Sequence, residues 1–284
     1  MSKEKIAVVT DSTAYIPAEL IEKYQIHVVP LSVIIDGVSY KEEVELQTAD
    51  FYKKIKETDS FPTSSQPAPG DFISLFHSLK EEGYNKVISV HLTSGISGTY
   101  QNAVSAGASV DGIDVIGVDS GLACMAQGTL AITAAKMAME GKTTKEILNH
   151  IEMMKNSMDA YFMVDDLNNL QRGGRLTGAQ AIIGSLLQIK PILHFQDKQI
   201  VLFEKVRTQK KALKRIEEIL EKAVQNNEAE EAYVIHGNAP EKGQQWLEEL
   251  QKQFPTVEFH LSYFGPVIGT HLGEGALGLT WSVK

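Results

Sequence analysis

The chain has 284 residues, of which 43% are hydrophobic, and this is enough for one large domain or two moderate ones. Its net charge of -9 argues against general nucleic-acid binding, because a phosphate backbone selects basic surfaces. A single cysteine, Cys124, excludes an internal disulfide, and no apolar run is long enough for a signal sequence or a membrane span. We therefore expect a cytoplasmic protein.

Short apolar runs alternate with amphipathic stretches through the first half of the chain. Residues 6–9 are continuously apolar, as in a strand buried on both faces, and they lead into the polar residues 10–13. Further strands are expected at residues 28–35, 86–90 and 115–118, with helices between them. This order predicts a mostly parallel sheet with flanking helices.

The pattern changes after about residue 157, where strands begin to follow one another more closely. Strands are predicted at residues 161–164, 191–194, 200–206, 231–236, 257–261 and 279–283, and helices at 178–188, 208–225 and 240–254. Residues 265–278 are rich in glycine and are predicted to form a loop. We predict two packed lobes, an N-terminal α/β lobe at residues 1–157 and a C-terminal α/β lobe at residues 158–284. The second lobe is expected to have the smaller, mixed sheet.

The turn at residues 91–100, with the sequence HLTSGISGTY, joins a predicted strand to a predicted helix. Such a turn places backbone N–H groups, including that of Gly98, and the hydroxyls of Ser94 and Ser97 at the positive end of a helix dipole. The arrangement suits an anion. The alternative is that Ser97 only caps the helix and the glycines only make the turn tight.

A second set of polar residues could bind the same anion. The proline-bounded residues 61–69 present Thr63, Ser64 and Ser65 on a restricted backbone, and His271 lies in the glycine-rich region near the C-terminus. Hydroxyls and an imidazole suit a carboxylate or a phosphate, although each residue alone can equally be structural.

Several common catalytic motifs are missing from the sequence. It has no Walker loop, dinucleotide fingerprint or nucleophile elbow, and its histidines lack metal-ligand spacing. We therefore predict no catalytic residue, no metal site and no cofactor.

Basic residues form two further features in this acidic chain. Arg172 and Arg175 bracket a Gly-Gly pair, where they could contact an anionic head group or a partner, or could bond helix-end carbonyls or nearby aspartates. A basic cluster follows, formed by Lys205, Arg207, Lys210, Lys211, Lys214 and Arg215. Such a cluster is usually a solvated helix face, but it could also dock an acidic partner or anionic lipid heads in a transient membrane contact.

Six motifs occur in a specific order along the whole chain. They are VTDSTA, PTSSQPAPGDF, TSGISGTYQNA, VDS, LQRGGRL and IGTHLGEGALG. On these motifs the chain resembles the DegV family of bacterial fatty-acid-binding proteins, of the FakB type. The resemblance implies two α/β lobes with one long-chain fatty acid buried between and within them. It also implies a carrier, not an enzyme, which presents the fatty acid to a separate ATP-dependent fatty acid kinase for acyl-phosphate formation and phospholipid synthesis.

The resemblance also assigns roles to residues. Ser64, where relatives often have threonine, Ser97 with the neighbouring Gly98 N–H, and His271 match the positions that bind the carboxylate. Arg172 and Arg175 would lie near the ligand head or the kinase surface. Apolar residues that could line a tunnel for the tail are Phe162, Ile182, Ile183, Leu186, Leu187, Ile192, Leu193, Phe264, Val267 and Ile268.

Two other functions remain open on the sequence alone. One is an enzyme that acts on a small phosphorylated or carboxylated metabolite, suggested by Arg172, Arg175 and the aspartates Asp11 and Asp119 at predicted strand ends. The other is a regulatory lipid sensor. The sequence indicates neither the preferred acyl chain nor the oligomeric state.

Overall fold

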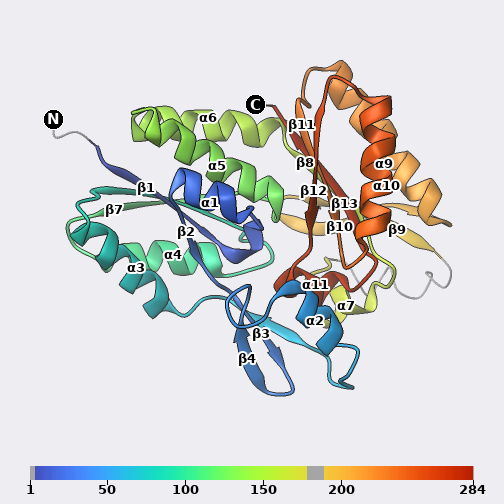
Figure 1. Ribbon diagram of the computed structural model, residues 1–284, viewed down its shortest axis with the longest axis horizontal. Coiled ribbons are helices and arrows are strands. Elements are labelled where there is room, and N and C mark those ends of the chain that lie inside the picture. Colours follow the sequence, from blue (N-terminus) through green and yellow to red (C-terminus); the bar gives the residue numbers. More distant parts are fainter. Residues whose placement is uncertain (1–3, 178–188, 284) are drawn as a thin grey trace. The chain divides into compact units, whose positions relative to one another are not determined.

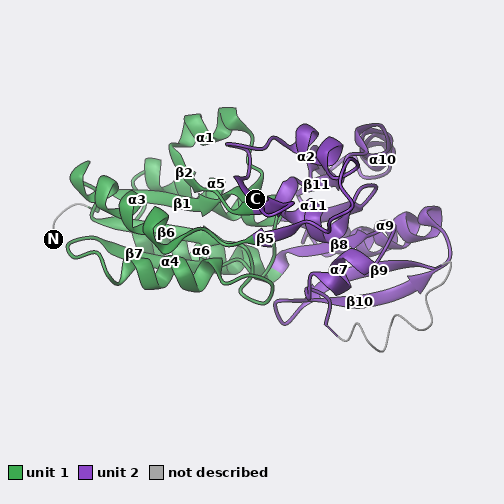
Figure 2. Ribbon diagram, turned by 90° about the horizontal axis from the view of Figure 1, so that it is seen from below, with its two compact units in different colours: residues 1–32, 65–156 green, residues 33–64, 157–284 purple. Residues whose placement is uncertain are grey.

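The computed structural model describes residues 4–177 and 189–283 (Figure 1). The chain forms two compact units, which are coloured separately in Figure 2. Unit 1 consists of Met1–Ser32 and Ser65–Asn156, and unit 2 consists of Val33–Ser64 and Ser157–Lys284. The helix expected at residues 178–188 lies outside the described residues.

Residues 33–64 belong to unit 2, whereas the sequence placed them in an N-terminal lobe of residues 1–157. Three contacts explain the difference. The buried Tyr52 hydroxyl donates a hydrogen bond to the Phe264 carbonyl at 2.9 Å, the Val267 N–H donates to Glu42 Oε1 at 2.7 Å, and Lys56 pairs with Glu274 at 2.8 Å. The segment therefore makes its long-range contacts with the C-terminal part of the chain.

The predicted strand at residues 28–35 is in fact two strands in different sheets. Strand β2 ends at Val29 and β3 starts at Ser32. Pro30 lies between them, and proline has no N–H to donate to a sheet ladder. The chain therefore leaves the first sheet at this point and enters another one.

Unit 1 contains a four-stranded sheet in the order β2-β1-β6-β7, with every neighbouring pair parallel, as predicted. Its strands are β1 (Ile6–Asp11), β2 (Ile26–Val29), β6 (Lys86–His91) and β7 (Asp114–Asp119). Its helices are the short 3-10 helix η1 (Ser12–Ala14), α1 (Ala18–Tyr24), α3 (Pro69–Glu81), α4 (Thr99–Gly107), α5 (Met125–Met139) and α6 (Thr144–Ser157). Helices α3 and α4 cover one face of this sheet and α5 covers the other (Figure 1). Because both faces are buried, its strands read as continuous apolar runs.

Helix α4 approaches β7 very closely, and two glycines make this possible. A Cβ on Gly107 would lie 2.5 Å from Val115 Cβ, and a Cβ on Gly117 would lie 2.5 Å from a Val104 methyl. No real side chain tolerates such distances. The glycines thus fix where α4, and the turn that precedes it, lie on the sheet.

Unit 2 contains a six-stranded mixed sheet in the order β10-β9-β8-β13-β11-β12, in which only β11 and β12 are parallel. Its strands are β8 (Asp159–Met163), β9 (Lys190–Gln196), β10 (Gln199–Val206), β11 (Glu231–His236), β12 (Glu258–Tyr263) and β13 (Leu277–Ser282). Its helices are α2 (Thr48–Lys54), α7 (Asn168–Arg172), α9 (Gln209–Gln225), α10 (Pro240–Gln253) and α11 (Pro266–Leu272). The mixed sheet was predicted, but the expectation that it would be the smaller of the two was wrong.

A three-stranded sheet in the order β4-β3-β5 completes the fold. Its strands are β3 (Ser32–Ile35), β4 (Val38–Lys41) and β5 (Thr63–Ser65). Asp36 and Gly37, a residue pair typical of hairpin turns, form the turn between β3 and β4, with φ values of 52° and 78°. Strand β5 is at the edge of this sheet, which suits a short strand that prolines flank on both sides.

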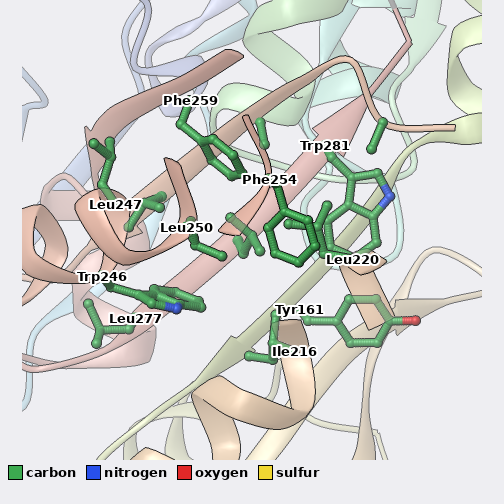
Figure 3. Packing of buried hydrophobic residues seen from close by; sticks show 14 of the residues in the cluster. Tyr161, Ile216, Leu220, Trp246, Leu247, Leu250, Phe254, Phe259, Leu277 and Trp281 are labelled. Atoms are coloured by element: carbon green, nitrogen blue, oxygen red, sulfur yellow. The ribbon is translucent and has the colours of Figure 1, made fainter. Parts of the chain in front are cut away.

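Helices α9 and α10 pack on one face of the six-stranded sheet. Figure 3 shows the cluster that they form, in which Trp246 of α10 lies beside Leu277 of β13, and Tyr161 lies near Ile216 of α9. Helix α9 begins at Thr208, whose side chain accepts a hydrogen bond from the Lys211 N–H. This apolar layer anchors the sheet from its helix-covered side.

The opposite face of the sheet is also apolar. The register aligns one row of residues across all six strands, which is Ser262, Ile235, Gly278, Phe162, Leu193 and Leu202. Aligned residues in paired strands share a face. Phe162, Leu193 and Ile235 are buried without belonging to the α9–α10 cluster. Unit 2 thus has a second apolar layer.

Residues 265–278 were predicted as a loop, but they include helix α11. Every residue of this helix is buried. It has Pro266 in its first turn and Gly273 immediately after its end, a combination that is typical of short helices and that the glycine content obscured. The helix fixes His271 in its last turn.

Candidate functional site

Ser64 and His271 lie in direct contact within unit 2. The distance between Ser64 Oγ and His271 Nε2 is 2.8 Å, although 207 positions separate the residues in sequence. Ser64 is held on β5 and is half-buried, whereas His271 is held on α11 and is only 8% exposed. The structure therefore brings two of the predicted site residues together on rigid elements.

The environment of His271 keeps its imidazole neutral. Burial lowers the pKa of His271 to about 4, and the charge of Arg175 acts in the same direction. A neutral imidazole carries one proton, so one ring nitrogen donates and the other accepts. At pH 7 the pair of Ser64 and His271 thus offers hydrogen-bond donors without a full positive charge.

Acidification should destabilise the fold through His271. Between pH 4 and pH 6.5 the unfolded chain binds a proton that the folded chain does not, so stability falls as the pH is lowered through this window. Protonation of this single group should lower the free energy of unfolding by about 3 kcal/mol as the pH falls through the window. Urea unfolding at several pH values, compared between the wild type and His271→Asn, measures that share. The exposed His77 is the control, and equal pH slopes for the wild type and His271→Asn would contradict the prediction.

The two arginines of the LQRGGRL motif have different environments. Arg172 is exposed, and its guanidinium lies 5.6 Å from the centre of the Phe61 ring. Arg175 is half-buried, its Nη1 donates a hydrogen bond to the Gly173 carbonyl, and burial lowers its pKa. Arg175 therefore bonds a carbonyl, which was one of the structural alternatives for this residue. It also lies where its charge helps to lower the pKa of His271.

The turn between β6 and α4 contains the candidates from unit 1. Ser97 Oγ accepts a hydrogen bond from the Thr99 N–H at 3.3 Å and lies 2.9 Å from Thr99 Oγ1. Gly98 is exposed, and the end of the exposed Gln66 side chain lies against it. Ser97 thus supports the start of the helix while remaining half-buried.

Ser94 is committed to a structural contact. Its hydroxyl donates to Asp119 Oδ2 at 2.6 Å and its N–H donates to Asp119 Oδ1 at 3.2 Å. The Gly121 N–H also donates to Asp119 Oδ1, at 3.1 Å. These bonds connect the turn to the end of β7, so Asp119 holds the turn in place.

A fully buried polar network lies at the carboxyl ends of β1 and β6. Asp11 Oδ1 accepts hydrogen bonds from the N–H and hydroxyl of Thr13, and Asp11 Oδ2 accepts from the Leu92 N–H at 3.1 Å and lies 2.9 Å from His91 Nδ1. His91 Nε2 is in turn 2.7 Å from Ser89 Oγ. The sequence suggested Asp11 as a residue that could contact a ligand. In the structure its carboxylate accepts hydrogen bonds from neighbouring segments and stabilises their conformation.

Thr63 and Ser65, which flank Ser64 on β5, are both exposed. The Ser65 hydroxyl donates to the Gln66 carbonyl at 3.1 Å. Of the three adjacent hydroxyl residues, only Ser64 contacts His271. This follows from the alternation of side chains along a strand.

The predicted tunnel residues fall into three groups. Phe162, Leu193, Phe264, Val267 and Ile268 are buried and lie outside the α9–α10 cluster. Ile192 belongs to that cluster and faces the helices. The apolar positions at residues 182, 183, 186 and 187 lie outside the described residues.

The basic cluster lies at the end of β10 and along α9. Arg215 is paired with Glu204 at 2.8 Å and with Glu218 at 3.1 Å, whereas Arg207 is exposed. Lys210 and Lys214 border a cavity of about 630 Å³ between α9 and α10. Part of the cluster is thus neutralised locally, and part faces an open groove.

Two kinds of feature are absent from the described residues. No helix within residues 4–177 or 189–283 is long and apolar enough to cross a membrane. In the same part of the chain, no group of three or more His, Cys, Asp or Glu residues could hold a metal ion.

Comparison with known proteins gives consistent matches over the full length. The family profile described as "Uncharacterised protein, DegV family" matches residues 5–284. A DegV domain-containing protein of Listeria innocua is 69% identical over 99% of both chains, and Protein DegV of Bacillus subtilis is 52% identical over 98% of this chain and 99% of its own.

Solved structures give the same result. The crystal structure of DegV, a fatty acid binding protein from Bacillus subtilis, matches with a TM-score of 0.93 at 51% identity, covering 99% of this chain and 100% of that one. A fatty acid binding DegV family protein from Streptococcus agalactiae matches with a TM-score of 0.92 at 35% identity, covering 99% of both chains. The α/β architecture is therefore shared with these proteins.

Proposed function

Because the chain belongs to the DegV family, we propose that it binds one long-chain fatty acid, with the carboxylate at Ser64 and His271. The 2.8 Å contact between Ser64 Oγ and His271 Nε2 is the observation that supports this most directly. A buried carboxylate must keep its hydrogen bonds, since losing them would offset the gain from burying the tail. A hydroxyl and a neutral imidazole on rigid elements satisfy this requirement.

The second apolar face of the six-stranded sheet supports the proposal because it offers a place for the acyl tail of the ligand. An acyl tail needs dry apolar surroundings, and each buried CH₂ contributes about 0.8 kcal/mol. Phe162, Leu193 and Ile235 supply apolar side chains on that face. We propose that the tail lies along this layer.

We further propose Ser97 and the Gly98 N–H as donors to the carboxylate. Their support is the family resemblance of the TSGISGTYQNA motif, together with the half-buried Ser97 and the exposed Gly98 in the turn. Thr63, Ser65 and Ser94 are weaker candidates, because the first two are exposed and the Ser94 hydroxyl is bonded to Asp119.

In this proposal the protein is a cytoplasmic carrier without a cofactor, and catalysis belongs to a separate fatty acid kinase. The support is the DegV resemblance and the family's fatty-acid-binding structures from Bacillus subtilis and Streptococcus agalactiae. Arg172, Arg207 and the lysines of α9 are the proposed contacts for the kinase or for a membrane surface. The enzyme hypothesis loses one of its reasons, since the Asp11 carboxylate is fully buried and bonded to its neighbours.

Native mass spectrometry of gently purified protein should show one long-chain fatty acid per chain. The loaded protein, mixed with a fatty acid kinase and ATP, should then yield acyl-phosphate. Protein that is empty, and that stays empty after incubation with oleate or palmitate, would refute fatty acid binding. Turnover of a water-soluble metabolite without a partner would favour the enzyme hypothesis instead.

A further inference from the structure

Gly173 packs directly against the imidazole of His271. A Cβ placed on Gly173 would lie 2.8 Å from His271 Cε1 and closer still to Nδ1. The backbone of Gly173 is helical, with φ -70° and ψ -12°, so its conformation would accept any residue. A side chain does not fit at this position because the His271 ring leaves no space for one.

The backbone of Gly173 is held at both ends. Its N–H donates to the Asn169 carbonyl at 2.9 Å, and its carbonyl accepts a hydrogen bond from Arg175 Nη1. The close-packed surface that Gly173 presents to His271 is thus fixed by α7 on one side and by Arg175 on the other.

The Nδ1 atom of His271 is buried and has no hydrogen-bond partner among the described residues. A buried N–H without an acceptor is rarer in proteins than an acceptor without a donor. The single proton of the neutral ring therefore belongs on Nε2, which faces Ser64 Oγ. The low pKa of His271 agrees with a ring that carries only one proton.

This tautomer matters for an anionic ligand. With the proton on Nε2, His271 can donate its one N–H to Ser64 Oγ or to a carboxylate oxygen, and Ser64 remains able to direct its own proton to the carboxylate. With the proton on Nδ1, Nε2 would present a lone pair to the carboxylate and repel it. One proton position thus decides whether the site attracts or rejects the head group.

We propose that Gly173 is a positioning residue for fatty acid binding: its contact with Nδ1 holds His271 in the Nε2–H tautomer and orients that N–H toward Ser64. The inference rests on the proposed function for its consequence in binding, but the tautomer itself is a property of the protein alone.

The test combines affinity with nitrogen NMR. Gly173→Ala should displace the ring and weaken oleate binding by about tenfold or more. In the His271→Ala background the same change should have little further effect, because Gly173 acts through the histidine. Gly70→Ala is the matched control, since Gly70 is helical and a Cβ placed on it would meet no atom within 4 Å. In ¹⁵N-histidine-labelled wild-type protein, Nε2 of His271 should carry the proton at pH 7.

The outcomes separate this inference from the proposed function. A wild-type spectrum with the proton on Nδ1 would overturn the inference whether or not lipid binds. Wild-type affinity in Gly173→Ala, or an equal loss in the His271→Ala background, would also overturn it. A wild type that binds no fatty acid but has the Nε2–H tautomer would refute the proposed function and leave the tautomer assignment standing.

Discussion

Alanine at both Ser64 and His271 should weaken binding of a long-chain fatty acid by about a hundredfold or more, since each lost hydrogen bond to a charged group costs about 1.5–3 kcal/mol. The reason is that the carboxylate would lose two donors without gaining water, because His271 is only 8% exposed. Each single variant should have part of this effect. The double variant should fold with a lowered Tm, since Ser64 is only half-buried but removal of the buried imidazole leaves a cavity.

Isothermal titration with oleate, after removal of co-purified lipid, measures the change. Ser39→Ala and His77→Ala serve as matched controls, because both side chains are exposed on well-formed elements, β4 and α3. Circular dichroism and Tm establish that each variant is folded. Unchanged affinity in a folded double variant would remove Ser64 and His271 from the binding site.

Replacement of Asp11 with alanine should have the largest effect on stability, lowering the free energy of unfolding by about 3–5 kcal/mol. Asp11 is fully buried, and its two oxygens accept hydrogen bonds from Thr13 and Leu92 and contact His91. Removing the carboxylate leaves these groups buried without their acceptor, and that costs more than the bonds themselves contribute.

Urea unfolding of Asp11→Ala and of the milder Asp11→Asn measures this loss. Hydrogen exchange at the Leu92 amide should accelerate more than exchange in unit 2, because the damage is local to the start of the turn after β6. Asp111→Ala, at an exposed aspartate, is the control. A stability within about 0.5 kcal/mol of the wild type would show that the network is not important for the fold.

Periodicity predicted the elements of the fold well where each element follows a single rule. The buried strands of unit 1 read as apolar runs because helices cover both faces of their sheet, and the turn at Asp36 and Gly37 has its expected geometry. The assignment of residues 33–64 to a lobe could not follow from such rules. It depends on contacts such as that between Tyr52 and Phe264, which 212 positions separate in sequence.

The candidate site shows a similar division. Residue types and motifs predicted Ser64 and His271 as site residues, and the fold brings these two side chains to 2.8 Å. The sequence could not show that Ser94 is bonded to Asp119, because a hydroxyl that donates to a carboxylate looks the same in sequence as one that awaits a ligand. It also could not show the contact of Gly173 with His271, since a glycine in RGGR can be required by backbone conformation or by close packing, and the sequence does not distinguish these two cases.

The membership of residues 33–64 in unit 2 has a consequence for biosynthesis. On the ribosome, the segments that form unit 1 are complete once residue 156 has emerged, but residues 33–64 must then wait for partners such as Phe264 and Val267. Domains generally fold as units, N-terminal first, during synthesis. The nascent chain therefore carries Glu42 and helix α2 without their contacts at Val267 and Phe264 until those residues have been made. The same ordering means that Ser64 cannot meet His271 until residue 271 has been made, so the head-group site forms after the segments of unit 1 are complete.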